Sequence, residues 1–163
     1  MLNTTNIHFG TSQTQKYQLS LHQAAAKGYS SVVRDKAAME PASINSADAH
    51  GLTPLHWAAS KGHAKTLQAL LNPEGRLLRI TPDLNAKDRQ GKTPLHYAAR
   101  YGQPKAIAVL IQAGADTKIK DYTGKTPLDT ARKFGQTAAV EAFENPEAIK
   151  KKSSLNRFFG CFG

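Results

Sequence analysis

Cysteine and long apolar stretches are almost absent from this sequence. The 163 residues contain one cysteine, Cys161, so no disulfide can form within the chain, and we expect a reducing compartment such as the cytoplasm or nucleus. No stretch approaches the roughly 18 consecutive apolar residues that a membrane-spanning helix needs. The first residues also lack an apolar run, so we expect no standard secretory signal peptide.

The motifs of common catalytic and nucleotide-binding sites are missing too. The chain has no G-x-S-x-G, P-loop or G-x-G-x-x-G sequence. It has six histidines, but no cysteine or carboxylate cluster accompanies them, whereas a zinc site needs four converging ligands. We therefore expect a protein that is not an enzyme and that uses no metal, cofactor or small-molecule substrate, although distant residues can converge on a site.

Positive charge is in excess along the whole chain. The 22 Lys and Arg residues outnumber the 12 Asp and Glu residues and give a formal net charge of +10. Residues 17–145 carry 17 basic and 11 acidic residues, and residues 146–163 carry four and one. A basic surface favours acidic partners, which include protein segments, nucleic acids and anionic membranes, and it also simply favours solubility.

One twelve-residue pattern occurs four times. It reads GLTPLHWAASKG at 51–62, GKTPLHYAARYG at 91–102 and GKTPLDTARKFG at 124–135, with a weaker copy, YQLSLHQAAAKG, at 17–28. Successive copies start 34, 40 and 33 residues apart. The Thr-Pro pair predicts the start of a helix, with the threonine as N-cap and the proline in the first turn. The glycine that closes each copy predicts the end of that helix.

Each copy predicts a pair of packed helices. In the second copy, Leu55, Ala58 and Ala59 recur at i, i+3 and i+4, which predicts an apolar stripe on the first helix. Apolar residues after the closing glycine, at 66–71 and 106–111, predict a second, outer helix that packs on the first. Because such a unit exposes apolar faces to its neighbours, we expect the units to stack around a continuous core.

A period near 33 residues with the motif T-P-L-H-x-A resembles the ankyrin-repeat family. The resemblance covers residues 17–145 and implies an all-α solenoid of about four helix–turn–helix units with hairpin loops. The first copy lacks Thr-Pro and the last has Asp129 in place of histidine, so we interpret both end units as caps. The expected units lie at about 17–50, 51–90, 91–123 and 124–145.

Three segments fall outside the regular pattern. We expect residues 1–16 to form a flexible N-terminal arm and residues 146–163 to form a basic, Phe-rich tail. The spacing of 40 residues exceeds the usual period by about seven, which predicts an enlarged loop at 72–82 after the second unit. Two interpretations of its residues Leu77, Leu78 and Ile80 stay open, namely packing on the adjacent outer helix and a second contact surface.

Three histidines, His22, His56 and His96, occupy the same position in different copies. This recurrence predicts a structural role, in which neutral rings bond to backbone groups in the turns between units. The histidines are one unit apart, so they do not converge as metal ligands.

Cations and aromatic residues recur on the face of each first helix that lies opposite its apolar stripe. The resemblance implies that this face and the hairpin tips line a concave binding surface, and Arg and aromatic residues dominate the energies of many interfaces. For Trp57 and Tyr97, packing against a hairpin is an alternative role, whereas Tyr101 and Phe134 precede a turn glycine and are harder to bury. The predicted partner-binding residues are Lys27, His50, Leu52, Trp57, Lys61, Arg89, Lys92, Tyr97, Arg100, Tyr101, Tyr122, Lys125, Lys133 and Phe134.

The C-terminal tail carries lysines followed by apolar residues at helical spacing. Three interpretations stay open: it covers the edge of the last unit, it docks on a partner or serves as an export address, or it contacts an anionic membrane with acylation of its cysteine. That cysteine is third from the end and does not fit the C-a-a-X rule. The predicted membrane or tail residues are Lys150, Lys151, Lys152, Phe158, Phe159, Cys161 and Phe162.

The family resemblance implies a protein–protein interaction module that binds, masks or inhibits its partner. A basic and aromatic surface favours a partner with an acidic and partly apolar segment. In size the chain is similar to the four-repeat inhibitors of cyclin-dependent kinases. It is also similar to ankyrin effectors that intracellular bacteria deliver into host cells, which implies delivery without a standard signal peptide. The alternative is a charge-driven peripheral membrane binder that uses the tail, or a nucleic-acid binder.

Overall fold

A computed structural model describes residues 16–71 and 81–147 of the chain. Residues 1–15 of the predicted N-terminal arm, the tail beyond residue 147 and most of the enlarged loop lie outside the described residues. The interpretations of Leu77, Leu78 and Ile80 therefore stay predictions, as do those of the tail residues from Lys150 to Phe162.

The described residues form helices joined by turns and hairpins, with no strand among them, so the prediction of an all-α fold is confirmed. The helices pair into four successive units, and a short 3-10 helix, η1 (Pro41–Asn45), follows the first pair. The pairs are α2 (Leu21–Lys27) with α3 (Ser30–Met39), α4 (Pro54–Ser60) with α5 (Ala64–Leu71), α6 (Pro94–Arg100) with α7 (Pro104–Gln112), and α8 (Pro127–Lys133) with α9 (Thr137–Glu144).

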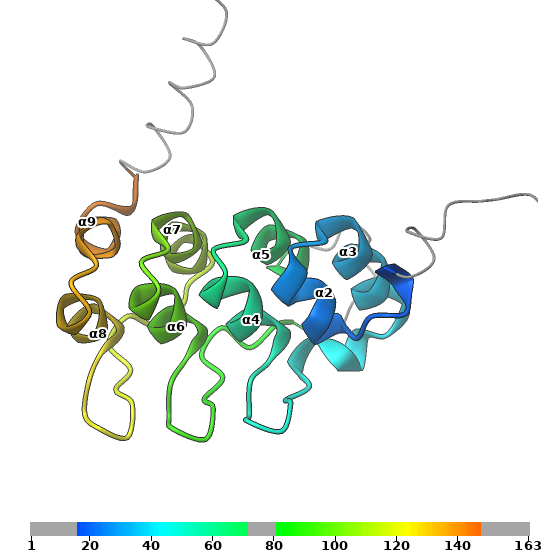
Figure 1. Cartoon of the computed structure of the whole chain (residues 1–163), viewed down its shortest axis with the longest axis horizontal. Helices are drawn as coiled ribbons and strands as arrows, with labels where there is room; N and C mark the ends of the chain where they lie inside the picture. Colours follow the sequence, from blue (N-terminus) through cyan, green and yellow to red (C-terminus); the bar gives the residue numbers. More distant parts are fainter. Residues whose placement is uncertain (1–15, 72–80, 148–163) are drawn as a thin grey trace, which may run out of the picture.

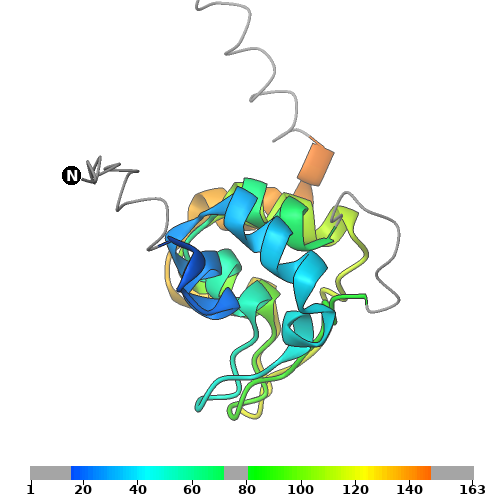
Figure 2. The same cartoon turned by 90° about the vertical axis from the view of Figure 1, so that its right-hand side faces the viewer.

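The four units stack in register. Each first helix contacts the first helix of the next unit, so α2, α4, α6 and α8 form one layer. The outer helices α3, α5, α7 and α9 form a second layer in the same way. Figure 1 shows the two layers as two rows, with the hairpins projecting together from the row of first helices, and Figure 2 looks along the stack.

The core runs through the stack without a break. Leu55, Ala58 and Ala59 are fully buried, which confirms the predicted apolar stripe on α4. The small alanine side chains let neighbouring first helices approach closely, and branched side chains fill the space between the two layers. The largest fully buried aliphatic residues are Ile44, Leu55, Leu67, Leu70, Leu95, Ile107 and Leu110.

A histidine links the start of each central first helix to the next unit. The backbone N–H of Thr53 donates to Nδ1 of His56 at 3.0 Å. Because a backbone N–H can only donate, Nδ1 accepts and the ring proton lies on Nε2. Nε2 then donates to the carbonyl oxygen of Lys92 at 3.1 Å, in the hairpin of the following unit.

The other units repeat or vary this link. His96 Nε2 lies 3.0 Å from the carbonyl oxygen of Lys125, and His22 Nε2 lies 2.8 Å from that of Ser46. The predicted structural role of these histidines is therefore confirmed. The last unit has Asp129 instead, which accepts hydrogen bonds from Thr126 at its own helix cap, and no later unit lies among the residues that the structure describes.

Candidate functional site

One aspartate organises each hairpin below the first helices. Asp48 Oδ1 accepts the backbone N–H groups of His50 at 2.8 Å and Leu52 at 3.0 Å. Asp88 and Asp121 organise the next two hairpins with the same pair of bonds, to residues two and four positions further on. The three hairpins therefore share one shape and hold their tips in one line.

The second oxygen of two of these aspartates anchors an aromatic ring. Trp57 Nε1 donates to Asp48 Oδ2 at 2.9 Å, and the Tyr97 hydroxyl donates to Asp88 Oδ2 at 2.7 Å. Burial and the bond to Asp88 raise the pKa of the Tyr97 hydroxyl. Burial alone would raise the pKa of the Asp48 carboxyl, but the bonds from Trp57, Leu52 and a further backbone N–H outweigh it and lower that pKa.

Two further aromatic rings on the same face are exposed to solvent. Tyr101 is 51% exposed and Phe134 is 43% exposed, which confirms that residues before the turn glycine stay open to solvent. The guanidinium carbon of Arg100 lies 4.9 Å from the Phe134 ring centroid and 5.7 Å from that of Tyr101. Lys133 Nζ lies 5.9 Å from the Phe134 centroid. Cation–π attraction therefore orients Arg100 between two exposed rings.

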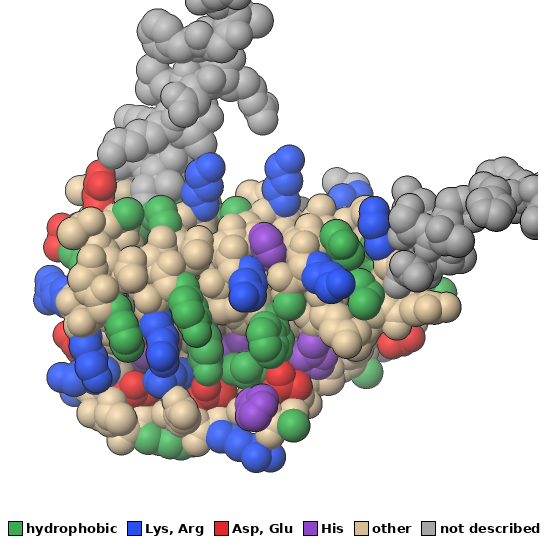
Figure 3. All heavy atoms as spheres, in the orientation of Figure 1, with side chains coloured by type: hydrophobic (Ala, Val, Ile, Leu, Met, Phe, Trp, Pro, Cys, Tyr) green, Lys and Arg blue, Asp and Glu red, His purple; other side chains and the backbone are tan. Residues whose placement is uncertain are grey.

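These side chains line two adjacent pockets between successive first helices. The pocket between the second and third units has a volume of about 230 Å³, and the pocket between the third and fourth has about 140 Å³. On this face, Figure 3 shows hydrophobic side chains alternating with Lys and Arg, above acidic groups near the hairpins. We call this surface the groove and define it by Trp57, Lys61, Tyr97, Arg100, Tyr101, Lys133 and Phe134.

The family model for ankyrin repeats, in three copies, matches residues 21–121 and again residues 75–152. The two matches together span more than half of the chain and cover all the described helices from α2 to α9. The chain belongs to the ankyrin-repeat family. Ankyrin repeats generally mediate protein–protein interactions, and proteins of this family are typically non-enzymatic interaction modules. The prediction of an ankyrin solenoid is therefore confirmed.

The ankyrin array brings most of the predicted binding residues onto one side. Seven of them define the groove, and Lys92 and Lys125 also line its smaller pocket. The tip residues His50 and Arg89 are exposed on the hairpins, and Lys27 is exposed at the end of α2. Their role in binding stays a prediction.

Leu52, another of the predicted binding residues in a hairpin, is nearly buried. Its side chain is only 9% exposed, because the Asp48 carboxylate and the hairpin backbone turn this residue back under the loop. Its side chain does form part of the wall of the larger pocket, and its role in binding stays a prediction.

The hairpin tips are joined to one another as well as to the helices. The backbone N–H of Tyr122 donates to the carbonyl oxygen of Gln90 at 3.0 Å, and that of Arg89 donates to His50 at 3.3 Å. The Tyr122 ring is 72% exposed, and Lys87 Nζ lies 5.9 Å from its centroid. The Tyr122 ring thus lies exposed at the tip of the last hairpin, next to Gly91 of the preceding hairpin.

Sequence reasoning missed the three hairpin aspartates. A signal was present, because Asp48, Asp88 and Asp121 each lie three residues before a hairpin glycine. The aspartates shape the hairpins and hold Trp57 and Tyr97, so they determine which part of each ring a partner meets. Since the polar atoms of these two rings are already bonded, it is their faces and edges that line the groove.

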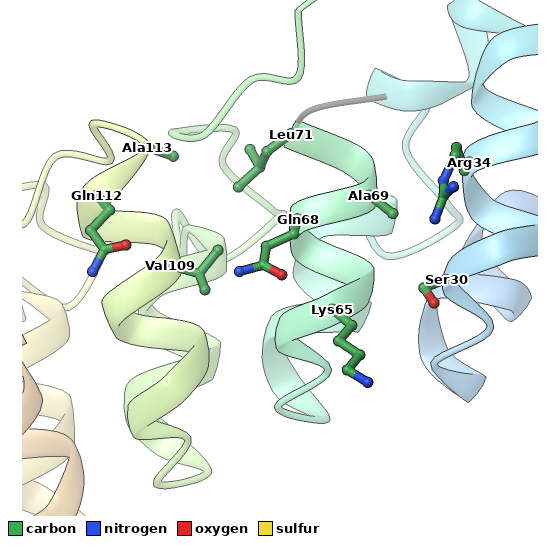
Figure 4. A pocket seen from close by; sticks show the side chains of 9 residues that line it. All are labelled: Ser30, Arg34, Lys65, Gln68, Ala69, Leu71, Val109, Gln112 and Ala113. Carbon is green, nitrogen blue, oxygen red and sulfur yellow. The ribbon is translucent and has the colours of Figure 1, made fainter. Parts of the chain in front are cut away.

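A larger hollow lies on the opposite layer, between the outer helices α3, α5 and α7, and has a volume of about 650 Å³. In Figure 4, Val109 of α7 faces Gln68 of α5, and Ala69 of α5 faces Arg34 of α3. The lining side chains include no aromatic residue, and the charged ones among them are Arg34 and Lys65. We therefore place the candidate site in the groove, despite the smaller volume of its pockets.

The described residues offer no other chemistry of note. Among them, no group of three or more His, Cys, Asp or Glu side chains lies close enough together to hold a metal ion. None of the helices described by the structure is both long and apolar enough to cross a membrane.

Proposed function

We propose that this ankyrin array is a non-enzymatic binding module. Its groove captures an acidic and partly apolar segment of another protein and thereby masks or inhibits that protein. The observation that carries this proposal is the position of Arg100, which is held between the exposed rings of Tyr101 and Phe134 with Lys133 beside them.

The arrangement suits both the approach and the retention of such a segment. Lys61, Arg100 and Lys133 project from three successive units on one face, so their summed field attracts carboxylates and speeds encounter. The exposed rings offer apolar area that water wets in the free protein and that a partner covers in the complex. Because Arg100 is already oriented, little side-chain entropy is lost on binding.

The test of this proposal is capture of partners from lysate with a groove variant. We expect the double substitution Arg100→Glu and Tyr101→Ala to lose at least ten-fold in partner capture, since it reverses one charge and removes one ring. The matched control is Lys105→Glu, which makes the same charge reversal on the exposed surface of α7. Capture is quantified by mass spectrometry, and circular dichroism checks that both variants keep their helices.

Two results would contradict the proposal. One is equal capture by the groove variant and the wild type. The other is an equal loss with Lys105→Glu, which would mean that net charge rather than the groove attracts partners. The expected complex is saturable and withstands moderate salt, because exposed rings as well as charges hold it.

The predicted alternative is contact of the tail with an anionic membrane. It is supported by the sequence of the tail, whose Lys150, Lys151 and Lys152 precede three phenylalanines. Sedimentation with anionic liposomes, with and without residues 146–163, tests it. Tail-dependent binding that disappears at high salt would favour this function. A reducing compartment, and delivery into a host cell as an effector, likewise stay proposals from sequence alone.

A further inference from the structure

The pairing of hairpin aspartates with aromatic rings stops at the last unit. Trp57 and Tyr97 each lie nine residues after the aspartate that they bond. The corresponding residue in the last unit is Thr130, which is too short to reach across. Its hydroxyl instead donates to the carbonyl oxygen of Thr126 at 3.0 Å, within its own helix.

Asp121 is therefore left with an unused carboxylate oxygen. Oδ1 accepts three bonds, from the N–H and hydroxyl of Thr123 and from the N–H of Lys125. Among the described residues, none donates to Oδ2, although the Asp121 residue is only 7% exposed. In the part of the chain that the structure describes, Thr66 Oγ1 is the one side-chain polar atom that is both fully buried and without a hydrogen-bond partner. Asp121 Oδ2 has no partner either, so it is not fully buried and water can reach it.

Asp121 also lines the smaller pocket of the groove, together with Thr130. The pocket measures about 140 Å³, which is close to the roughly 150 Å³ of a cavity that holds one benzene ring. Its walls include the rings of Tyr97 and Phe134 and the guanidinium of Arg100. In the two preceding units an aromatic ring bonds the hairpin aspartate, and in the last unit this pocket lies beside the equivalent pair, Asp121 and Thr130.

The chemistry of these walls selects one kind of occupant. An occupant that covers the unused oxygen of Asp121 and displaces water from it has to donate a hydrogen bond in its place, which excludes a plain phenylalanine ring and disfavours a carboxylate. Arg100, Lys125 and Lys133 around the pocket disfavour a cationic donor. A neutral ring with a hydroxyl satisfies both conditions, and an indole is larger than the benzene-sized space.

We propose that this pocket binds a tyrosine side chain of the partner segment, with its hydroxyl donating to Asp121 Oδ2. Acidic residues beside that tyrosine pair with Arg100, Lys125 and Lys133. The inference rests on the proposed function of the groove and adds a specificity to it: an acidic segment with a central tyrosine.

The test uses three acetylated peptides with the full chain: Glu-Asp-Tyr-Asp-Glu and its analogues with phenylalanine or phosphotyrosine at the centre. Titrations are followed by amide chemical shifts. We expect the tyrosine peptide to shift Thr123, Lys125 and Thr130 saturably, and to bind at least five-fold more tightly than the phenylalanine peptide. Equal binding of these two would overturn the inference. Tighter binding of the phosphotyrosine peptide would also overturn it, because it would reveal an anion site.

A pair of variants tests the pocket from inside the protein. Thr130→Tyr places a ring and hydroxyl where Tyr97 has them in the preceding unit, so we expect it to abolish the preference for tyrosine. Thr130→Val has nearly the volume of threonine, leaves the pocket open and keeps the preference. An unchanged preference in a folded Thr130→Tyr protein would overturn the inference. If that variant does not fold, the comparison of the tyrosine and phenylalanine peptides on the wild type still decides.

The two proposals fail in different ways. If only the tyrosine inference is wrong, Arg100→Glu with Tyr101→Ala still loses partner capture, while the peptides are not distinguished. If the groove itself is not the binding surface, that double variant captures partners as the wild type does.

Discussion

At the scale of single residues, the aspartates and histidines decide how the groove is built. Asp48 and Asp88 each bond the hairpin backbone with one oxygen and an aromatic ring with the other. Each of these side chains therefore determines both the shape of its hairpin and the position of its ring. The sequence predicted that Trp57 and Tyr97 lie on this face, with packing against a hairpin as the alternative. The two rings line the groove pockets and also bond their hairpin aspartates. Such bonds depend on side-chain geometry, which no repeat period specifies.

The buried histidines make stability depend on pH. Burial lowers the pKa of His56 and of His96 below the ordinary value of 6.5. As pH falls below about 6.5, the unfolded chain therefore takes up protons before the folded chain does, and the free energy of unfolding decreases. We expect the urea midpoint to be lower at pH 5.5 than at pH 7.5 and to change little above pH 7.5.

A matched variant identifies the source of this effect. His56→Gln should reduce the pH dependence, while His50→Gln on an exposed hairpin tip should leave it unchanged. The hydrogen bonds that lower the pKa of the Asp48 and Asp121 carboxyls act in a separate window, because that stabilisation is lost only as pH falls below about 4. A midpoint that does not change between pH 7.5 and 5.5 would contradict this account.

At the scale of elements, the helices were the most predictable part of the molecule. The threonine cap, the proline after it and the closing glycine are local signals that recur in the last three copies, so they define those first helices without knowledge of the rest. The outer helices expected at 66–71 and 106–111 begin two residues earlier, at Ala64 and Pro104. The buried position of Leu52 was not predictable, because it depends on how the hairpin curls back on the core.

The hairpins provide a test of stacking between elements. Gly51 and Gly124 occupy equivalent turns with φ of 84° and 77°, where a side chain costs about 1–2 kcal/mol of strain. A Cβ at Gly51 would also lie 3.0 Å from the backbone nitrogen of Arg89 in the next hairpin, whereas nothing lies within 4 Å at Gly124. We expect Gly51→Ala to destabilise the protein by about 1 kcal/mol more than Gly124→Ala in urea denaturation. Equal losses of stability in the two variants would mean that a side chain at position 51 does not clash with the neighbouring hairpin.

At the scale of the whole molecule, the stack converts a repeated sequence into a continuous surface. Positions that are 40 or 33 residues apart in sequence become neighbours, so Trp57, Tyr97 and Thr130 form one series. The sequence predicted this groove because equivalent positions of a solenoid line up. The sequence alone did not show that one oxygen of Asp121 lacks a partner. The structure was needed to show that the other hairpin aspartates bond the ring nine residues later.

The central claim is that the groove, rather than the layer of outer helices, contacts the partner. The most direct test is photo-crosslinking in lysate, with p-benzoylphenylalanine in place of Tyr101 in the groove or of Gln112 on the outer helix α7. The account predicts covalent adducts with the same partner protein from position 101 and only background labelling from position 112. Adducts from position 112 without any from position 101 would contradict it.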